Sequence, residues 1–170
     1  MGDKIQIAAL VLTSISAICA AAAAFANWIQ ARKAAQATEV TVYLALVDRY
    51  ETSDMRDAIS ALAEFWREKN GAFGGVADAF IEELNHNPEN ARKLRGHSRH
   101  LSAFFANAAR LYDGGFISKA LVKSLISRPG LNVFYEVAVP INATRNPYAT
   151  STHHEKILKS VVARYGGGIY

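Results

Sequence analysis

The chain opens with a continuous apolar stretch, and only after it do polar and apolar positions alternate. Residues 5–29 read IQIAALVLTSISAICAAAAAFANWI and hold no ionisable side chain except the thiol of Cys19. A helix of this length measures about 37 Å at about 1.5 Å per residue, whereas the hydrocarbon core of a bilayer is about 30 Å thick. Arg32 and Lys33 follow directly. The pattern predicts a transmembrane anchor over residues 1–33.

A cleaved secretory signal is the alternative interpretation of the same stretch. The small residues at 20–26 have the spacing that a signal peptidase requires. Against it, the leading MGDK offers only a weak basic region, and the apolar run is longer than that of a typical signal. The anchor is therefore the favoured interpretation.

The basic residues that flank the stretch predict its orientation. Arg32 and Lys33 lie directly after it, while Lys4 before it is offset by Asp3. Lysine and arginine next to a span are retained on the cytoplasmic side. We therefore expect a single-pass protein of the inner (cytoplasmic) membrane, with its N-terminus outside and its domain in the cytoplasm.

Small side chains line one side of the predicted span. Val11, Ile15, Ile18, Phe25 and Ile29 form a bulky stripe together with Ala22. Roughly opposite lie small residues, namely Thr13, Ala17, Ala20, Ala24 and Asn27. Small residues let helix backbones approach closely in lipid, where packing drives association. The stripe predicts contact with another integral membrane protein or with a second copy of the chain, although alanine can also simply be tolerated in a span.

Apolar residues recur every three or four positions through most of residues 34–165, which is typical of α helix. The first helix should continue to about Glu51, and Thr52 and Ser53 should cap the second one. Glycine and proline positions then divide the remainder into helices over residues 76–86, 88–113 and 118–127, with a loop at NGAFGGV.

The aromatic and β-branched segment after Gly130 could be mistaken for a strand. No partner strand is predicted elsewhere, so we expect a helix that is kinked or ended near Pro140. A last amphipathic helix should begin near Thr152, and residues 166–170 should form a flexible tail. The prediction is an all-α fold: one transmembrane helix continuing into a small cytoplasmic helical bundle, residues 34–165.

Charge is distributed unevenly between the two parts of this domain. Residues 39–89 carry eleven acidic and four basic side chains, whereas residues 90–170 carry three acidic and twelve basic ones. The balances of −7 and +9 are complementary, so the two parts either face each other or the basic part meets an anionic partner.

The candidate chemistry argues against an enzyme. Glu83 and His86 form an E-x-x-H pair, as in di-iron helical bundles, but no second pair or supporting glutamates accompany them. The domain also lacks a cysteine, a nucleophile elbow and a phosphate-binding glycine loop. We therefore expect no metal, no cofactor and no catalytic residue.

The densest basic cluster is RKLRGHSRH in the long helix. Its permanent charges are Arg92, Lys93, Arg95 and Arg99. Helical spacing puts three of them on one face, which could bind an anionic ligand or lipid. The alternative is a solvated face paired with the acidic part of the domain. Nucleic acid is the least favoured partner, because the neighbouring aromatic residues have the pattern of a core.

Residues 100–148 carry an aromatic helix with Phe104, Phe105 and Asn107, a Gly-Phe-Ile-Ser turn and a closing aromatic helix that ends near Arg145. This third of the chain resembles an uncharacterised bacterial family of single-span membrane proteins with a helical domain of unknown function. The resemblance implies the architecture and no catalytic residue.

Together these features favour a non-enzymatic accessory or scaffolding subunit of a larger membrane complex. The alternative function is a membrane-tethered sensor or signalling module that binds an anionic ligand through Arg92, Arg95 and Arg99.

Overall fold

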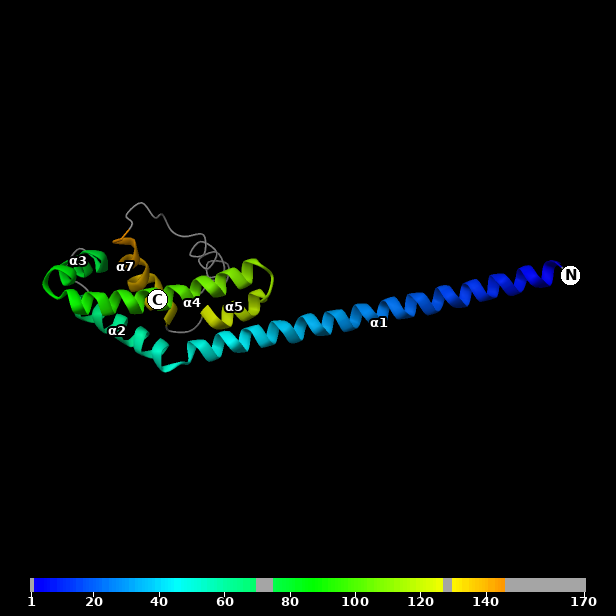
Figure 1. Cartoon of the computed structure of the whole chain (residues 1–170), viewed down its shortest axis with the longest axis horizontal. Helices are drawn as coiled ribbons and strands as arrows, with labels where there is room; N and C mark the ends of the chain where they lie inside the picture. Colours follow the sequence, from blue (N-terminus) through cyan, green and yellow to red (C-terminus); the bar gives the residue numbers. More distant parts are fainter. Residues whose placement is uncertain (1, 70–74, 127–129, 146–170) are drawn as a thin grey trace. The chain divides into compact units, whose positions relative to one another are not determined.

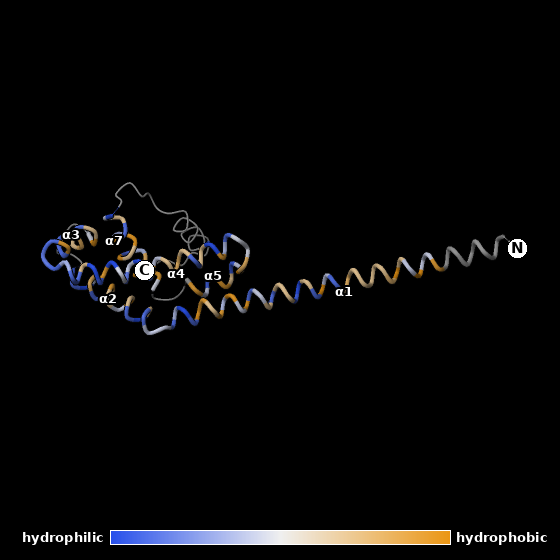
Figure 2. Tube along the Cα trace, viewed as in Figure 1, coloured by the Kyte–Doolittle hydropathy of each residue, from blue (hydrophilic) through white to orange (hydrophobic). Residues whose placement is uncertain are grey.

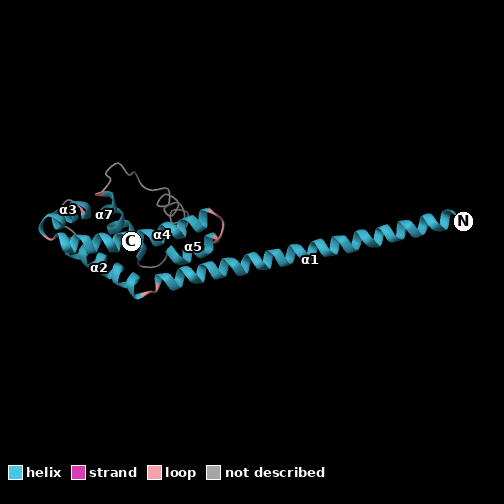
Figure 3. Cartoon of the chain, in the orientation of Figure 1, coloured by secondary structure: helices cyan, strands magenta, loops and turns pink. Residues whose placement is uncertain are grey.

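The computed structural model describes residues 2–69, 75–126 and 130–145, with side chains from Leu12 onward, and every regular element in these ranges is a helix (Figures 1 and 3). The described part of the chain is thus all-helical, as predicted. It divides into two compact units, Met1–Val40 and Thr41–Tyr170.

The first unit consists of the greater part of α1, a helix that spans Gly2–Tyr50. Its described side chains, from Leu12 to Val40, are exposed except for the half-buried Ile29 and Glu39. Within the described residues α1 is the one helix long and apolar enough to cross a membrane, with a mean hydropathy of 1.6 in its most apolar window (Figure 2). A signal sequence near an N-terminus has the same length and composition, so this property alone fits both interpretations.

The second unit packs the end of α1 and the later helices around α4. The elements are α2 (Ser53–Lys69), α3 (Val76–His86), α4 (Pro88–Asp113), α5 (Lys119–Ile126), α6 (Gly130–Val133), the π-helical turn η1 (Phe134–Ala138) and α7 (Val139–Ala143). The central helix α4 contacts α2, α3, α5, η1 and α7. The boundaries of α3 and α4 match the predicted ones.

The core of this unit is built around aromatic rings. Phe104 and Phe105 of α4 are fully buried, which confirms that they belong to the core. The ring centroids of Tyr50 and Phe104 lie 5.4 Å apart, and those of Phe134 and Phe105 lie 5.0 Å apart. Edge-to-face and tilted ring pairs add to the stability that apolar burial provides. The end of α1 and the η1 turn are therefore both tied to α4.

Side-chain caps set two of the helix boundaries. The hydroxyl of Thr52 accepts a hydrogen bond from the backbone N–H of Met55 at 3.3 Å, and the side chain of Asn87 accepts one from the N–H of Asn90 at 3.3 Å. Each cap satisfies one of the N–H groups that a first helical turn leaves without a partner. Capping by Thr52 is thus confirmed, whereas Ser53 is the first residue of α2 and its hydroxyl donates to Asp54 Oδ1 at 3.5 Å.

The segment around Pro140 is helical, and its irregularity precedes the proline. The N–H of Val139 donates to the carbonyl of Phe134, five residues back, which closes a π-helical turn. Proline has no N–H and disturbs the ladder of the turn before it. The carbonyl of Ala138 accepts a hydrogen bond at 2.9 Å from the fully buried Ser98 hydroxyl. A tertiary bond from α4 therefore supports the irregular turn.

The apolar residues Ala37, Val40, Leu44 and Val47 recur at helical spacing, which predicts that they form the buried face of this part of α1, but this prediction is wrong for most of them. Val40 and Leu44 are 51% and 53% exposed, whereas Leu46 and Tyr50 are buried. The predicted last helix, the predicted tail and most of the predicted NGAFGGV loop lie outside the described residues.

Candidate functional site

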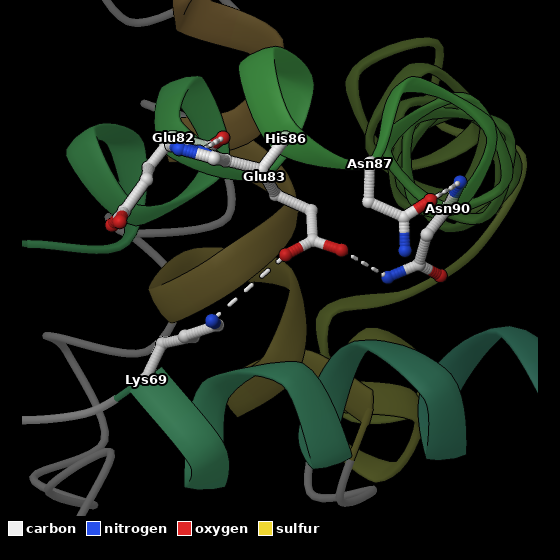
Figure 4. A network of polar contacts seen from close by, with 6 residues as sticks. All are labelled: Lys69, Glu82, Glu83, His86, Asn87 and Asn90. Atoms are coloured by element: carbon white, nitrogen blue, oxygen red, sulfur yellow. Dashed lines mark hydrogen bonds and ion pairs between the residues drawn. The ribbon is translucent and has the colours of Figure 1, made fainter.

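The E-x-x-H pair takes part in the junction between α3 and α4 (Figure 4). Glu83 accepts a hydrogen bond from the Asn90 side-chain amide at 2.7 Å, and its other carboxylate oxygen lies 3.9 Å from Lys69 Nζ. His86 Nδ1 lies 3.0 Å from the backbone carbonyl of Glu82, one helical turn earlier. The described residues contain no group of three side chains suited to a metal ion. Glu83 thus links three helices, and His86 interacts with its own helix.

The predicted basic cluster on α4 divides into three different environments. Arg95 is half-buried, and its guanidinium carbon lies 5.1 Å from the centroid of the buried Phe80 ring. A cation over an aromatic face contributes to packing. Lys93 forms an exposed ion pair with Glu89 at 3.0 Å. Arg92 and Arg99 are exposed.

This division changes what the cluster can bind. Arg92 and Arg99 lie seven residues apart, which is about 10 Å along a helix. Two exposed guanidinium groups at that distance can contact separate phosphates, but they do not form one tight anion pocket. Arg95 is better described as part of the interface between α3 and α4.

Sequence reasoning did not identify a groove between α2 and the segment from α6 to η1. This cavity has a volume of about 400 Å³ and is mainly apolar. It is lined by Ala63, Trp66, Arg67, Asn132, Val133, Glu136 and Val137. Adjacent aromatic residues at 65 and 66 were the available signal, because neighbouring side chains of a helix point in different directions and a helix covered on one side buries only one of them. The structure buries Phe65 and leaves Trp66 half-buried.

The small stripe of the predicted span is accessible to solvent along its whole length. Thr13, Ala17, Ala20, Ala24 and Asn27 are all exposed, as is the bulky stripe from Ile15 to Phe25. Among the described side chains of the apolar segment, from Leu12 to Ile29, only Ile29 is partly covered.

Phe25, Trp28 and Arg32 form a cluster at the C-terminal end of this apolar segment. The rings of Phe25 and Trp28 stack with centroids 5.9 Å apart, and the guanidinium carbon of Arg32 lies 5.6 Å from the Trp28 centroid. Tryptophan and arginine are enriched at the boundary between hydrocarbon and headgroups. The local geometry is the one expected where a span leaves the bilayer.

Comparisons of the chain with protein-family models, with curated proteins and with solved structures gave no match. The resemblance of residues 100–148 to a single-span family therefore stays a prediction. The function therefore has to be inferred from the geometry of the described residues.

Proposed function

We propose that the protein is a non-enzymatic accessory or scaffolding subunit of a membrane complex. One N-terminal span anchors it in the inner membrane, its N-terminus lies outside, and its helical domain lies in the cytoplasm. The partners are other integral membrane proteins or further copies of the chain.

The observation that carries this proposal is the apolar part of α1. Its most apolar window has a mean hydropathy of 1.6, and none of that window is buried against the rest of the chain. A helix with this composition needs an apolar environment, because exposing it to water costs free energy in proportion to its apolar area. The Trp28–Arg32 pair at its end and the basic Lys33 next to it support a span with its C-terminal end at the cytoplasmic face.

Two measurements test the anchor and its orientation. The chain should remain in membranes after an alkaline carbonate wash, and protease added to intact cells should leave the region after Lys33 undigested. Release by carbonate, or digestion from outside the cell, would contradict the proposal.

Replacements in the small stripe test whether the predicted span associates with a partner. Extraction in mild detergent followed by native mass determination should recover the chain in a fixed ratio with integral membrane proteins or with itself. Replacing Ala17 and Ala20 by leucine should weaken this association, because larger side chains keep the helix backbones apart. Ala22→Leu, on the bulky stripe, is the matched control and should leave it intact. Equal effects of both changes would remove the small stripe from the proposal.

A second function is favoured by the exposure of Arg92 and Arg99. The membrane-tethered domain would then act as a sensor for an anionic ligand that contacts both side chains. A chain that is extracted without partners, and that binds inorganic phosphate or a nucleotide more weakly when Arg92 and Arg99 are replaced by glutamate, would support the sensor over the subunit.

A further inference from the structure

The loop between α4 and α5 presents an aromatic side chain to solvent on a well-defined turn. The N–H of Gly115 donates to the carbonyl of Tyr112 at 3.0 Å, and the N–H of Phe116 donates to the carbonyl of Leu111 at 2.8 Å. Gly115 has a φ of 73°. These two bonds and a left-handed glycine make a Schellman motif, which fixes the backbone at the end of the helix.

The position that Phe116 occupies in this motif usually packs back onto the helix. Here the ring lies over Gly114, where a Cβ would come within 3.0 Å of two of its carbons, and the side chain remains 58% exposed. The next residue, Ile117, is only 3% exposed. Among the described residues after Lys33, Phe116 is the most exposed of the large apolar side chains. The turn therefore directs one aromatic ring outward and anchors its neighbour in the core.

Basic residues precede and follow Phe116 in the sequence; Lys119 is half-buried and Lys123 is exposed. Arg110 lies in the last turns of α4, and Lys119 and Lys123 lie on α5, with Asp113 as the acidic residue among them. Three basic groups and one acidic group give residues 110–123 a balance of +2. An exposed aromatic ring flanked by lysine and arginine is the combination that binds anionic lipid surfaces.

Within the second unit, the loop lies at the same end as the part of α1 around Tyr43. The ring of Tyr50 contacts Phe104, about two-thirds of the way along α4, and seven residues earlier the hydroxyl of Tyr43 lies 2.9 Å from that of Ser124 on α5. The residues of α1 that precede Tyr50 therefore approach α5 and the C-terminal end of α4, as Figure 1 shows for this unit.

Chain length limits how far the second unit can lie from the predicted membrane boundary. Eight residue steps separate Lys33 from Thr41, the first residue of the second unit, which corresponds to about 12 Å of helix. By contrast, Arg92 lies 21 residues before Asp113, or about 31 Å along α4 from the loop. Within the second unit, Arg92 and the loop therefore lie at opposite ends of α4.

We propose that residues 114–118 form a membrane-surface contact, in which Phe116 enters the interfacial region and Lys119 and Lys123 meet anionic headgroups. This inference rests on the proposed span. The contact holds the helical domain against the bilayer and so limits the directions from which a partner can reach the groove beside Trp66.

The test places an environment-sensitive probe on the full-length chain. Cys19→Ala removes the native thiol, and Phe116→Cys then carries a nitrobenzoxadiazole label. The matched control is Ile81→Cys, an exposed apolar position on α3, where the side chain is 46% exposed. Both chains are reconstituted into phosphatidylcholine vesicles with or without phosphatidylglycerol, and a headgroup nitroxide lipid serves as quencher.

The expected result is a blue-shifted emission at position 116 and its quenching by the nitroxide lipid, stronger with phosphatidylglycerol, with neither change at position 81. Replacing Lys119 and Lys123 by glutamate should remove the dependence on phosphatidylglycerol. Equal emission and quenching at both positions, in chains that stay in carbonate-washed vesicles, would overturn the membrane contact alone. Equal quenching at position 116 with and without phosphatidylglycerol would overturn the role of anionic headgroups. Release of the chains by carbonate would instead overturn the span, and the contact with it.

Discussion

Tyr50→Phe removes one oxygen atom from the point where α1 meets α6. The hydroxyl of Tyr50 accepts a hydrogen bond from the N–H of Gly130 at 2.8 Å. Gly130 begins α6, so its N–H belongs to the first helical turn and has no acceptor within that helix. Both residues are buried. Without the hydroxyl, this N–H is left buried with neither protein nor bulk water as acceptor.

The size of the effect follows from this burial. Leaving a buried donor unsatisfied costs about 1–3 kcal/mol of the free energy of unfolding. At about 4 °C per kcal/mol for a domain of this size, the melting temperature should fall by roughly 4–12 °C. The ring itself remains, so its contact with Phe104 and its apolar burial should change little.

The assay is thermal unfolding of the full-length chain in mild detergent, followed by circular dichroism. The apolar part of α1 keeps its helix in detergent because its backbone bonds lie within the segment, so the transition reports the helical domain. Tyr43→Phe is the matched control: it also removes one hydroxyl from α1, but the bond between Tyr43 and Ser124 is exposed, and water can replace it. Equal melting temperatures for the two variants would refute the argument that burial of the Gly130 N–H makes this bond important.

Three further changes test the packing by the same assay. Gly130→Ala should destabilise the domain more than Tyr50→Phe, because its Cβ would lie 2.6 Å from the Tyr50 hydroxyl and force the helices apart; a melting temperature equal to that of the wild type would contradict this close approach. Ser98→Ala should cost about 1–2 kcal/mol, because the buried carbonyl of Ala138 loses the hydroxyl donor that reaches it from α4; Ser98→Thr, which keeps the hydroxyl, separates loss of the bond from a change in packing. Lys93→Ala should change the free energy of unfolding by no more than about 0.5 kcal/mol, because its ion pair is exposed, and a larger loss would show that α4 depends on this pair.

Local signals along the chain were sufficient to predict the helices. The proline at 88 and the glycines after Asp113 gave the boundaries of α4, because residues that begin or end a helix act through the nearest few positions. The same reasoning identified the segment around Pro140 as helix. It could not place the π-helical turn, which accepts a hydrogen bond from Ser98, forty residues away.

The sequence by itself determined that the chain is helical and that its first part is apolar enough to span a membrane, because both properties depend on local composition and spacing. Only the tertiary structure decided which side chains of each helix are covered. Leu46 and Tyr50 are buried while Val40 and Leu44 are exposed, and Arg95 lies against Phe80 while Arg92 and Arg99 face solvent. Helical spacing marks the faces of a helix, but burial depends on which neighbour packs against each face, and residues distant in the sequence provide that neighbour.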